Sequence, residues 1–424
     1  MATNQTVLPT PEVDLESSST FWSFVMKPFR RKLKNLRIKI KRWMIRFISI
    51  FPLTSKHIGS PKGFYTYSRE YYDLFNSEFL NVLDYKAHML SSISRRNIPI
   101  SIHKKIHRNF TDKYIHENPE TFLLTVPNGR VVTNKGTIIT HNDMLLLDVS
   151  LQFGIEGIAK KAKSHQIFNY LKLPFFQKTD QKIAVMATAG GGNFFHWLTD
   201  ALPRFEIIRK TSGLESIDKY VVNKGIPIID ETLTMLGIPS DKLIYADKNL
   251  HIQAKNLVVP SLPGLTGNPP AWVIAFLREN FLNGLASVSK VPKLYISRSK
   301  AKRRKVINED DLLKYLEKFG FTPVWLEDHN LSTQISLFSS AEHIVAPHGA
   351  GLTNLIWCNP NAKVLEIFSP SYVNVCFWAI ANQVKLEYHY IIGNRKNSEC
   401  INPTLDNINV PIEDFRRSLD RFLF

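Results

Sequence analysis

The feature that most constrains this chain is an alternation of short apolar strands and helices that runs twice along the sequence. The first series starts at residue 182 and ends at Pro260, before the breaker-rich segment SLPGLTGNPP, and the second starts at residue 293. Apolar strands separated by helices are typical of a parallel sheet that is covered on both faces. The sequence therefore predicts an α/β protein with two Rossmann-like domains joined by a Pro/Gly-rich connector.

The expected strands are Lys182–Ala187, Tyr220–Asn223, Lys242–Ala246 and Asn256–Val259 in the first series, and Lys293–Ser297, Thr322–Leu326, His343–Ala346 and Lys363–Ile367 in the second. Helices are expected at about 194–210, 229–236, 271–287, 308–319, 332–340 and 351–357. A small antiparallel meander is expected at 121–151, where β-prone runs are separated by turn pairs such as Asn128-Gly129. Ligands bind beyond the carboxyl ends of strands in such sheets, so the loops after the strands are the places to look for a site.

The charge of the chain is concentrated near its N-terminus. Of a formal net charge of +17, thirteen cations fall between Ser17 and Arg69, where there is no Asp or Glu. The remainder is close to neutral, which argues against a nucleic-acid-binding body. The three cysteines are far apart, which argues against a disulfide framework or a cysteine zinc site and favours a reducing compartment.

Residues 1–20 are polar and are expected to be a disordered leader. In the segment 21–55 that follows, apolar residues recur every three or four positions and cations occupy the other faces, which predicts a basic amphipathic helix. Such a helix can lie in the headgroup plane of an anionic membrane. The residues expected to contact the membrane are Phe29, Leu33, Leu36, Ile40, Trp43, Arg30, Arg31, Lys34 and Arg37.

Three alternatives stay open for this segment: a helix packed on the body of the protein, a short coiled-coil seam, and a surface for nucleic acid or another partner. The segment has no run of about 20 apolar residues that would span a bilayer. Cations interrupt every candidate core of a secretory signal. The expected location is therefore cytoplasmic, peripherally associated with the inner face of a membrane.

The strongest local signal is HIVAPHGAGLTNLIW, at 343–357. A strand runs directly into His348, Gly349, Ala350 and Gly351, and Thr353 and Asn354 follow in a predicted helix. Two glycines permit a close backbone approach, and the first amides of a helix attract phosphate. This predicts an anion-binding loop, and the alternative is a tight turn with a capping role.

Two further segments carry candidate ligand contacts. Glu366 is a carboxylate in an otherwise apolar strand, where it needs a partner, either a ribose diol or a buried basic residue. Arg298 follows the strand at 293, and Arg303 and Arg304 follow in the same loop. Guanidinium groups at this position can bind a diphosphate in bidentate fashion, although a basic run is often only a solvated loop.

The segment GGGNFFHWLTDALPRF, at 190–205, carries a candidate acid/base pair. His196 and Asp200 are four residues apart and therefore lie on one face of a helix. Either one can act as the base for an attacking hydroxyl. The alternative is that His196 packs in the core and that Asp200 pairs with Arg204. The chain has no Walker signature, no HExxH and no DxD triad, so no metal is expected.

Four segments in this order and spacing, namely NFFHWLTDALPR, LYISRSKAKRRKVINED, HGAGLTN and VLEIF, resemble glycosyltransferase family 61, over roughly residues 120–395. The resemblance implies a GT-B fold with two Rossmann-like domains facing a cleft, and inverting transfer from a UDP-sugar without a catalytic metal. It implies that Arg298, Arg304, His348, Gly349, Gly351 and Glu366 hold the donor. His196 and Asp200 would then face a saccharide or lipid-linked acceptor.

The expected organisation is an acceptor-side domain at 65–268, a nucleotide-sugar domain at 271–400 and a helical tail at 401–424. The basic arm stands where eukaryotic members carry a lumenal anchor, and the cysteines are few. Both features favour a bacterial, cytoplasmic-side member acting in surface or capsular polysaccharide synthesis. A non-catalytic nucleotide-sugar or polysaccharide-binding protein is the second hypothesis.

Overall fold

The computed structural model describes Leu36, Ile40 and residues 59–76, 78–81, 93–154, 159–282, 290–394 and 405–424. Apart from Leu36 and Ile40, the predicted leader and amphipathic helix lie outside the described residues. The chain divides into two compact units, Met1–Ser60 with Ser164–Leu173, and Pro61–Lys163 with Pro174–Phe424. In the first unit, a 3-10 turn at Gln166–Asn169 is capped by His165, whose Nδ1 accepts a hydrogen bond of 3.2 Å from the amide of Ile167.

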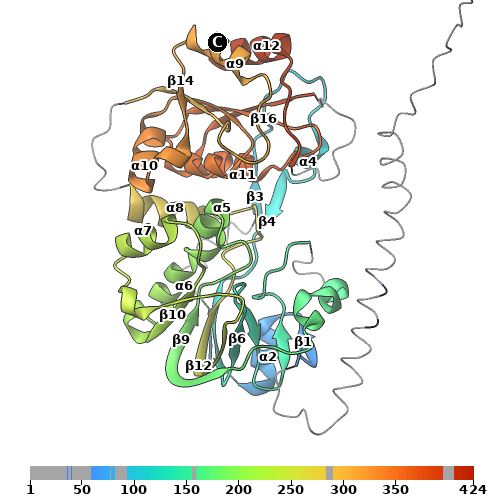
Figure 1. The fold of residues 1–424 in the computed structure, drawn as a ribbon, viewed down its shortest axis with the longest axis vertical. Helices are drawn as coiled ribbons and strands as arrows, with labels where there is room; N and C mark the ends of the chain where they lie inside the picture. The colour runs from blue at the N-terminus through green and yellow to red at the C-terminus, as the bar shows by residue number, and fades with distance from the viewer. Residues whose placement is uncertain are drawn as a thin grey trace, which may run out of the picture. The chain divides into compact units, whose positions relative to one another are not determined.

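The second unit contains two large sheets, and the one nearer the C-terminus is entirely parallel (Figure 1). Its strands, in spatial order, are β14 (Thr322–Val324), β13 (Lys293–Ile296), β15 (His343–Pro347), β16 (Lys363–Phe368) and β17 (Glu387–Ile392). Neighbouring residues of a strand point to opposite faces, and both faces are apolar here: Ile344 packs into one core cluster and Val345 into another.

Helices cover both faces of this parallel sheet. The face of Ile344 packs against α10 (Leu331–Ser340), α11 (Cys376–Val384) and the 3-10 helix η9 (Ala350–Trp357). The face of Val345 packs against α9 (Glu309–Glu317) and α12 (Ile412–Leu423). The doubly covered parallel sheet expected from the second strand series is confirmed.

The other sheet has ten strands and is mixed. Its parallel part is formed by β12 (His251–Pro260), β9 (Gln177–Val185), β10 (Lys219–Val222) and β11 (Leu243–Tyr245). The predicted meander is confirmed in part: β6 (Arg130–Val132), β7 (Thr137–Ile139) and β8 (Met144–Leu146) pair antiparallel in sequence order, whereas β5 (Phe122–Pro127) pairs with β2 and β12. It is continuous with the sheet, because β5 and β6 both pair antiparallel with the long strand β12.

The following strands and helices also belong to the second unit. Strand β1 (Gly63–Tyr65) pairs with β8, and β2 (Phe79–Asn81) pairs with β5. Strands β3 (Ile93–Arg95) and β4 (Ile115–Glu117) form a separate ribbon. The helices are α2 (Ser68–Phe75), α4 (Arg108–Thr111), α5 (Phe194–His196), α6 (Arg204–Thr211), α7 (Ile228–Met235) and α8 (Ala271–Phe281).

Two predicted helices differ in type from the sequence-based expectation. The helix expected at 194–210 is divided, because a π-helical turn at Trp197–Ala201 separates α5 from α6. The helix expected at 351–357 is the 3-10 helix η9, which begins at Ala350. Among the described residues, no helix is long and apolar enough to cross a membrane.

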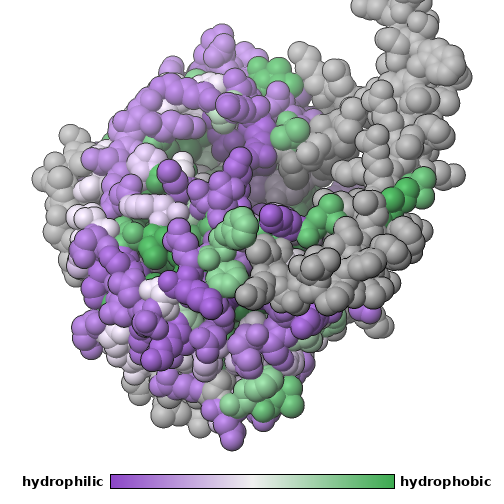
Figure 2. Space-filling view, turned by 60° about the horizontal axis from the view of Figure 1, so that its bottom comes forward, coloured by the Kyte–Doolittle hydropathy of each residue, from purple (hydrophilic) through white to green (hydrophobic). Residues whose placement is uncertain are grey.

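One apolar cluster links the two sheets. It includes Ala184 and Val258 of the mixed sheet, Phe276 and Leu277 of α8, and Ile344 of the parallel sheet. The outer surface is different: Figure 2 shows a face on which hydrophilic side chains predominate and hydrophobic ones gather in small, separate patches. Because α8 follows the connector at 261–270 directly, the shared core fixes that connector between two well-packed elements.

Candidate functional site

The carboxyl ends of β13 and β15 bring an arginine and a glycine together. These strands are neighbours, and Arg298 follows one while Gly349 follows the other. A Cβ atom built on Gly349 would come within 2.0 Å of Nη1 of Arg298. The guanidinium group thus occupies the space that a side chain at 349 would need. The glycine is required here for a close approach of an arginine to the backbone.

Of the three predicted arginines in the basic loop after β13, two have side chains that lie near Gly349 or bond to its neighbour His348. Arg298 donates from Nη2 to the carbonyl oxygen of Arg303 at 3.0 Å, and Arg304 donates from Nε to the carbonyl oxygen of His348 at 3.0 Å. The guanidinium of Arg304 also lies 5.5 Å from the ring centre of Tyr372. Arg303 takes part through its backbone, and its side chain is exposed.

The electrostatics of this cluster favour an anion. Burial, together with the charges of Arg304 and Arg303, lowers the pKa of Arg298 to about 10, while the charge of Glu327 acts in the opposite direction. Its Nε is buried and has no hydrogen-bond partner within the part of the chain that the structure describes. A buried donor on a charged group is costly when it is unpaired. An anionic ligand beside Arg298 would remove that cost.

The start of η9 adds amides to the arginines. Gly349 is the N-cap residue, and the first amides of a helix have no partner within it. They attract anions together with the helix dipole. Gly351 serves packing, since a Cβ atom there would come within 2.6 Å of Cδ1 of Leu326.

Thr353 and Asn354 are placed differently from the expectation. Both are fully buried, and their side chains bond within the protein. The Thr353 hydroxyl donates to the carbonyl oxygen of Ala350 at 2.6 Å, and Asn354 donates from Nδ2 to Oε1 of Gln334 at 2.8 Å. Direct contact with a donor, as predicted for these two residues, does not fit this burial. They instead hold the loop in shape.

Glu366 also departs from its predicted role. Its carboxylate is completely buried, one oxygen bonds to Nδ1 of His348, and the other accepts from the hydroxyl of Tyr388. No exposed surface remains for a ribose diol, so the alternative of a buried basic partner fits instead. Burial, and then the charge of Glu366, raise the pKa of Tyr388 well above its ordinary value, so the phenol stays a donor. Glu366 therefore fixes the ring of His348.

His196 and Asp200 form the pair that their spacing predicts. Nδ1 of His196 lies 2.8 Å from Oδ2 of Asp200, and the side chains are 24% and 8% exposed. The alternative pairing with Arg204 is not present, since the guanidinium of Arg204 bonds to backbone carbonyl oxygens, including those of Met186 and Ala187. The more exposed member of the pair is the histidine.

The backbone around this pair is unusual. The amide of Leu202 donates to the carbonyl oxygen of Trp197 at 2.8 Å, which closes a π turn. Such turns are rare and often occur at functional sites. Upstream, the Asn193 side chain caps α5 by accepting a 3.0 Å hydrogen bond from the amide of Phe195. The entry to the helix is thus fixed, and the turn that carries Asp200 is widened.

Sequence reasoning missed two neighbours of the pair. The hydroxyl of Thr266, in the connector, donates to Oδ2 of Asp200 at 2.8 Å. The ring of Phe153 lies 4.9 Å from the ring of His196 and is tilted by 48°. The breakers around Thr266 marked a connector but gave no sign of this bond. Nothing in the sequence marked Phe153.

Buried Arg96 supports the connector from another direction. It donates from Nη2 to Oδ1 of Asn268 at 2.9 Å, and its guanidinium lies 5.2 Å from the ring centre of Trp378 on α11. Asn268 is two residues from Thr266. A residue of the β3–β4 region therefore ties the connector to a helix of the parallel sheet, a contact that no local sequence pattern signals.

Aromatic rings in contact with one another connect the histidine–aspartate pair to the arginine–glycine loop. The ring of Phe195 lies 5.2 Å from that of His196 and 5.8 Å from that of Phe377, which in turn lies 5.0 Å from the ring of His348. Consistently, α5 packs against η9. The structure thus brings the arginine–glycine loop and the histidine–aspartate pair into one neighbourhood.

Comparison with known proteins points to sugar transfer. The family model described as glycosyltransferase 61 matches residues 194–365. A β-1,2-xylosyltransferase of Oryza sativa subsp. japonica is 40% identical over 62 residues, which are 15% of this chain and 12% of that protein. The EGF domain-specific O-linked N-acetylglucosamine transferase of Drosophila melanogaster is 31% identical over 134 residues, 27% of this chain and 26% of that protein. The matches span about a quarter or less of these relatives.

Proposed function

We propose that this chain, which belongs to the glycosyltransferase 61 family and so to a class of sugar-transferring enzymes, moves a sugar from a nucleotide donor to a glycan or lipid-linked acceptor. The nucleotide is UDP, the transfer inverts the anomeric centre, and no metal takes part. The two sheets act as the halves of a GT-B enzyme. The observation that carries the proposal is the half-buried Arg298, whose buried Nε has no hydrogen-bond partner among the described residues and lies beside Gly349 at the start of η9.

The donor diphosphate binds where Arg298, Arg304 and the first amides of η9 meet. Two guanidinium groups and a helix N-terminus supply the positive field that stabilises negative charge on a leaving nucleotide. His348, held by Glu366, faces the same loop and donates to the diphosphate or the sugar. Glu366, Thr353 and Asn354 act indirectly, by positioning the loop.

The base is His196. Its Nδ1 is engaged by Asp200, so Nε2 is the ring nitrogen that can take a proton. Asp200, held by Thr266, orients the ring and stabilises the imidazolium that forms. This division of roles between a histidine and a buried carboxylate is common in catalysis.

The proposed reaction moves one proton and one glycosyl group. An acceptor hydroxyl gives its proton to Nε2 of His196 as its oxygen forms a bond to the anomeric carbon of the donor. The bond between that carbon and the β-phosphate oxygen breaks, and its electron pair leaves with UDP. The charge that develops on the diphosphate is met by the arginines and amides. The acceptor is an intermediate in the synthesis of a surface polysaccharide.

The decisive experiment measures UDP release from a panel of UDP-sugars by the full-length protein, with and without EDTA, together with UDP binding by thermal shift. We expect release with at least one donor, unchanged by EDTA. Abolition by EDTA would contradict the metal-independent mechanism. Failure of UDP to raise the melting temperature of wild-type protein would refute the donor site itself.

A further inference from the structure

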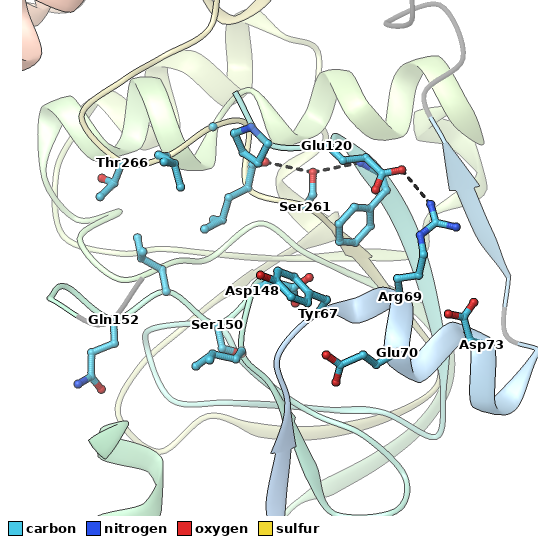
Figure 3. A pocket seen from close by; sticks show the side chains of 17 residues that line it. Tyr67, Arg69, Glu70, Asp73, Glu120, Asp148, Ser150, Gln152, Ser261 and Thr266 are labelled. Carbon is cyan, nitrogen blue, oxygen red and sulfur yellow. Dashed lines mark hydrogen bonds and ion pairs between the residues drawn. The ribbon is translucent and has the colours of Figure 1, made fainter. Parts of the chain in front are cut away.

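The structure contains a second feature close to the proposed base, a cavity of about 640 Å³ (Figure 3). Its walls come from α2, from the segment that leads into β5, from the loop after β8 and from the connector. Those segments are distant in sequence, and the sheet pairings of β1 with β8 and of β5 with β12 bring them together. Neither the predicted donor residues nor His196 and Asp200 line it.

One end of the cavity reaches the proposed base. Thr266 lines the cavity, and its hydroxyl bonds to Asp200 at 2.8 Å. Gln152 also lines it, and the next residue, Phe153, lies against the ring of His196. Two separate segments therefore connect the wall of the cavity to the histidine–aspartate pair.

The lining is acidic in a chain whose overall charge is +17. Its ionisable side chains are Arg69, Glu70, Asp73, Glu120 and Asp148. Arg69 pairs with Glu120 at 2.9 Å, which leaves three carboxylates in excess. The donor loop has the opposite character, since Arg298 and Arg304 converge there. The donor loop is therefore complementary to an anionic ligand, and the acidic cavity is complementary to a ligand without negative charge.

Four neutral polar residues, Ser150, Gln152, Ser261 and Thr266, also line the cavity, and the rest of the lining is largely apolar and suits the carbon skeleton of a sugar. Figure 3 shows Tyr67 among the side chains that line the cavity. Tyr67 is 58% exposed and Leu265 is 47% exposed, so both offer apolar surface to a ligand. Aromatic side chains combine an apolar face with a polar handle, and carboxylates accept hydrogen bonds from hydroxyl groups.

We propose that this cavity is the acceptor site and that it takes an uncharged saccharide, while it rejects acceptors that carry a phosphate or carboxylate near the reacting sugar. The inference rests on the proposed function, because the position of the base defines which cavity serves the acceptor. It narrows that function, since a sugar linked directly to a lipid pyrophosphate would place its charge among the carboxylates. Like charges brought together in this way oppose binding strongly.

The test uses two probes that differ only at C6, which is a neutral hydroxymethyl group in p-nitrophenyl β-D-glucopyranoside and a carboxylate in p-nitrophenyl β-D-glucuronide, together with the corresponding galactose pair. Ligand-observed NMR with full-length protein gives the dissociation constants. We expect the neutral member of a pair to bind at least about tenfold more tightly, the ratio that corresponds to 1.4 kcal/mol. Glu70→Gln with Asp73→Asn should reduce this preference.

A variant that fills the cavity tests whether the neutral probe binds there. Leu265→Trp fills the cavity and should abolish binding of the neutral probe, while Met235→Trp, at an exposed position at the end of α7, should leave it intact. Equal binding of both members of a pair, binding retained in Leu265→Trp, or no binding of any neutral probe would each overturn the proposal. UDP thermal shifts in the same samples report on the donor site, so failure here is distinguishable from failure of the proposed function.

Discussion

The guanidinium group of Arg298 and the backbone of Gly349 share a space that admits no side chain between them, because a Cβ at 349 would approach Nη1 to 2.0 Å. This contact joins two loops that follow neighbouring parallel strands. It also explains why the glycine is needed although its backbone is extended. Glycine and arginine should therefore behave as one functional unit.

Gly349→Ala should displace the guanidinium and weaken UDP binding. Arg298→Ala should lower kcat/KM by on the order of 10²–10³, as the loss of other oxyanion-type donors does. We expect Gly349→Ala to lower it by at least about tenfold, and the double variant to be little worse than Arg298→Ala alone. Gly59→Ala is the control, since a methyl group there meets nothing within 4 Å. Additive losses would show that the contact is incidental.

Removing Glu366 should cost stability as well as donor affinity. Glu366→Ala leaves the buried His348 and Tyr388 without their partner, and the expected loss in unfolding free energy is about 3–5 kcal/mol. Tyr388→Phe removes one hydrogen bond to a charged group and should cost about 1.5–3 kcal/mol. Glu387→Ala, on the neighbouring strand and 41% exposed, should cost about 1 kcal/mol or less. Urea unfolding of the three variants provides the comparison.

Substitutions at the catalytic pair separate the base from its orienting partner. His196→Ala should reduce kcat by about 10²–10⁴. Asp200→Asn should lower kcat less, and Thr266→Val should have the smallest effect. Thr211→Val on α6 is the matched control, because its hydroxyl bonds only to the backbone of its own helix among the described residues. A kcat that falls further in Asp200→Asn than in His196→Ala would assign the base to Asp200.

Sequence patterns predicted the features that depend on residues close together in the chain. The eight predicted strands were found because each is an apolar run bounded by breakers, although β9 and β12 each begin five residues earlier than expected, at Gln177 and His251. The i,i+4 spacing was sufficient to place His196 next to Asp200, because helix geometry fixes that distance. The π turn between them was not predicted, since intrinsic preferences favour an ordinary α-helix there.

Contacts between residues that are far apart in the chain could not be predicted from the sequence. The bond of Tyr388 to Glu366 depends on the register of β16 and β17. Thr266 reaches Asp200 across 66 residues of chain, and Arg96 reaches Asn268 across 172. Such contacts follow from how sheets and helices pack, which a single sequence does not specify. For the same reason Glu366 suggested a ribose contact, whereas the fold supplies a histidine.

The basic arm should be necessary for membrane binding. Each cation close to an anionic bilayer contributes about 1 kcal/mol, so deletion of residues 1–55 should abolish co-sedimentation with vesicles containing phosphatidylserine. Leu33→Glu with Trp43→Glu should weaken binding by interrupting the predicted apolar stripe. Neutral phosphatidylcholine vesicles serve as the control. Equal sedimentation of the full-length and truncated proteins would contradict a membrane role.

Asp148 should make stability depend on pH in a defined direction. Burial raises its pKa from 3.8 to about 6, although Ser68 donates to it from both its amide and its hydroxyl. A carboxyl whose folded pKa is raised favours folding when protonated, so its contribution is complete below pH 3.8 and is lost as the pH rises through 6. The unfolding free energy of wild type minus that of Asp148→Asn should therefore fall by about 1–3 kcal/mol between pH 4 and pH 7.5. Asp180→Asn, at an exposed position of β9, should show no such change, and a difference that rises with pH would contradict the assignment.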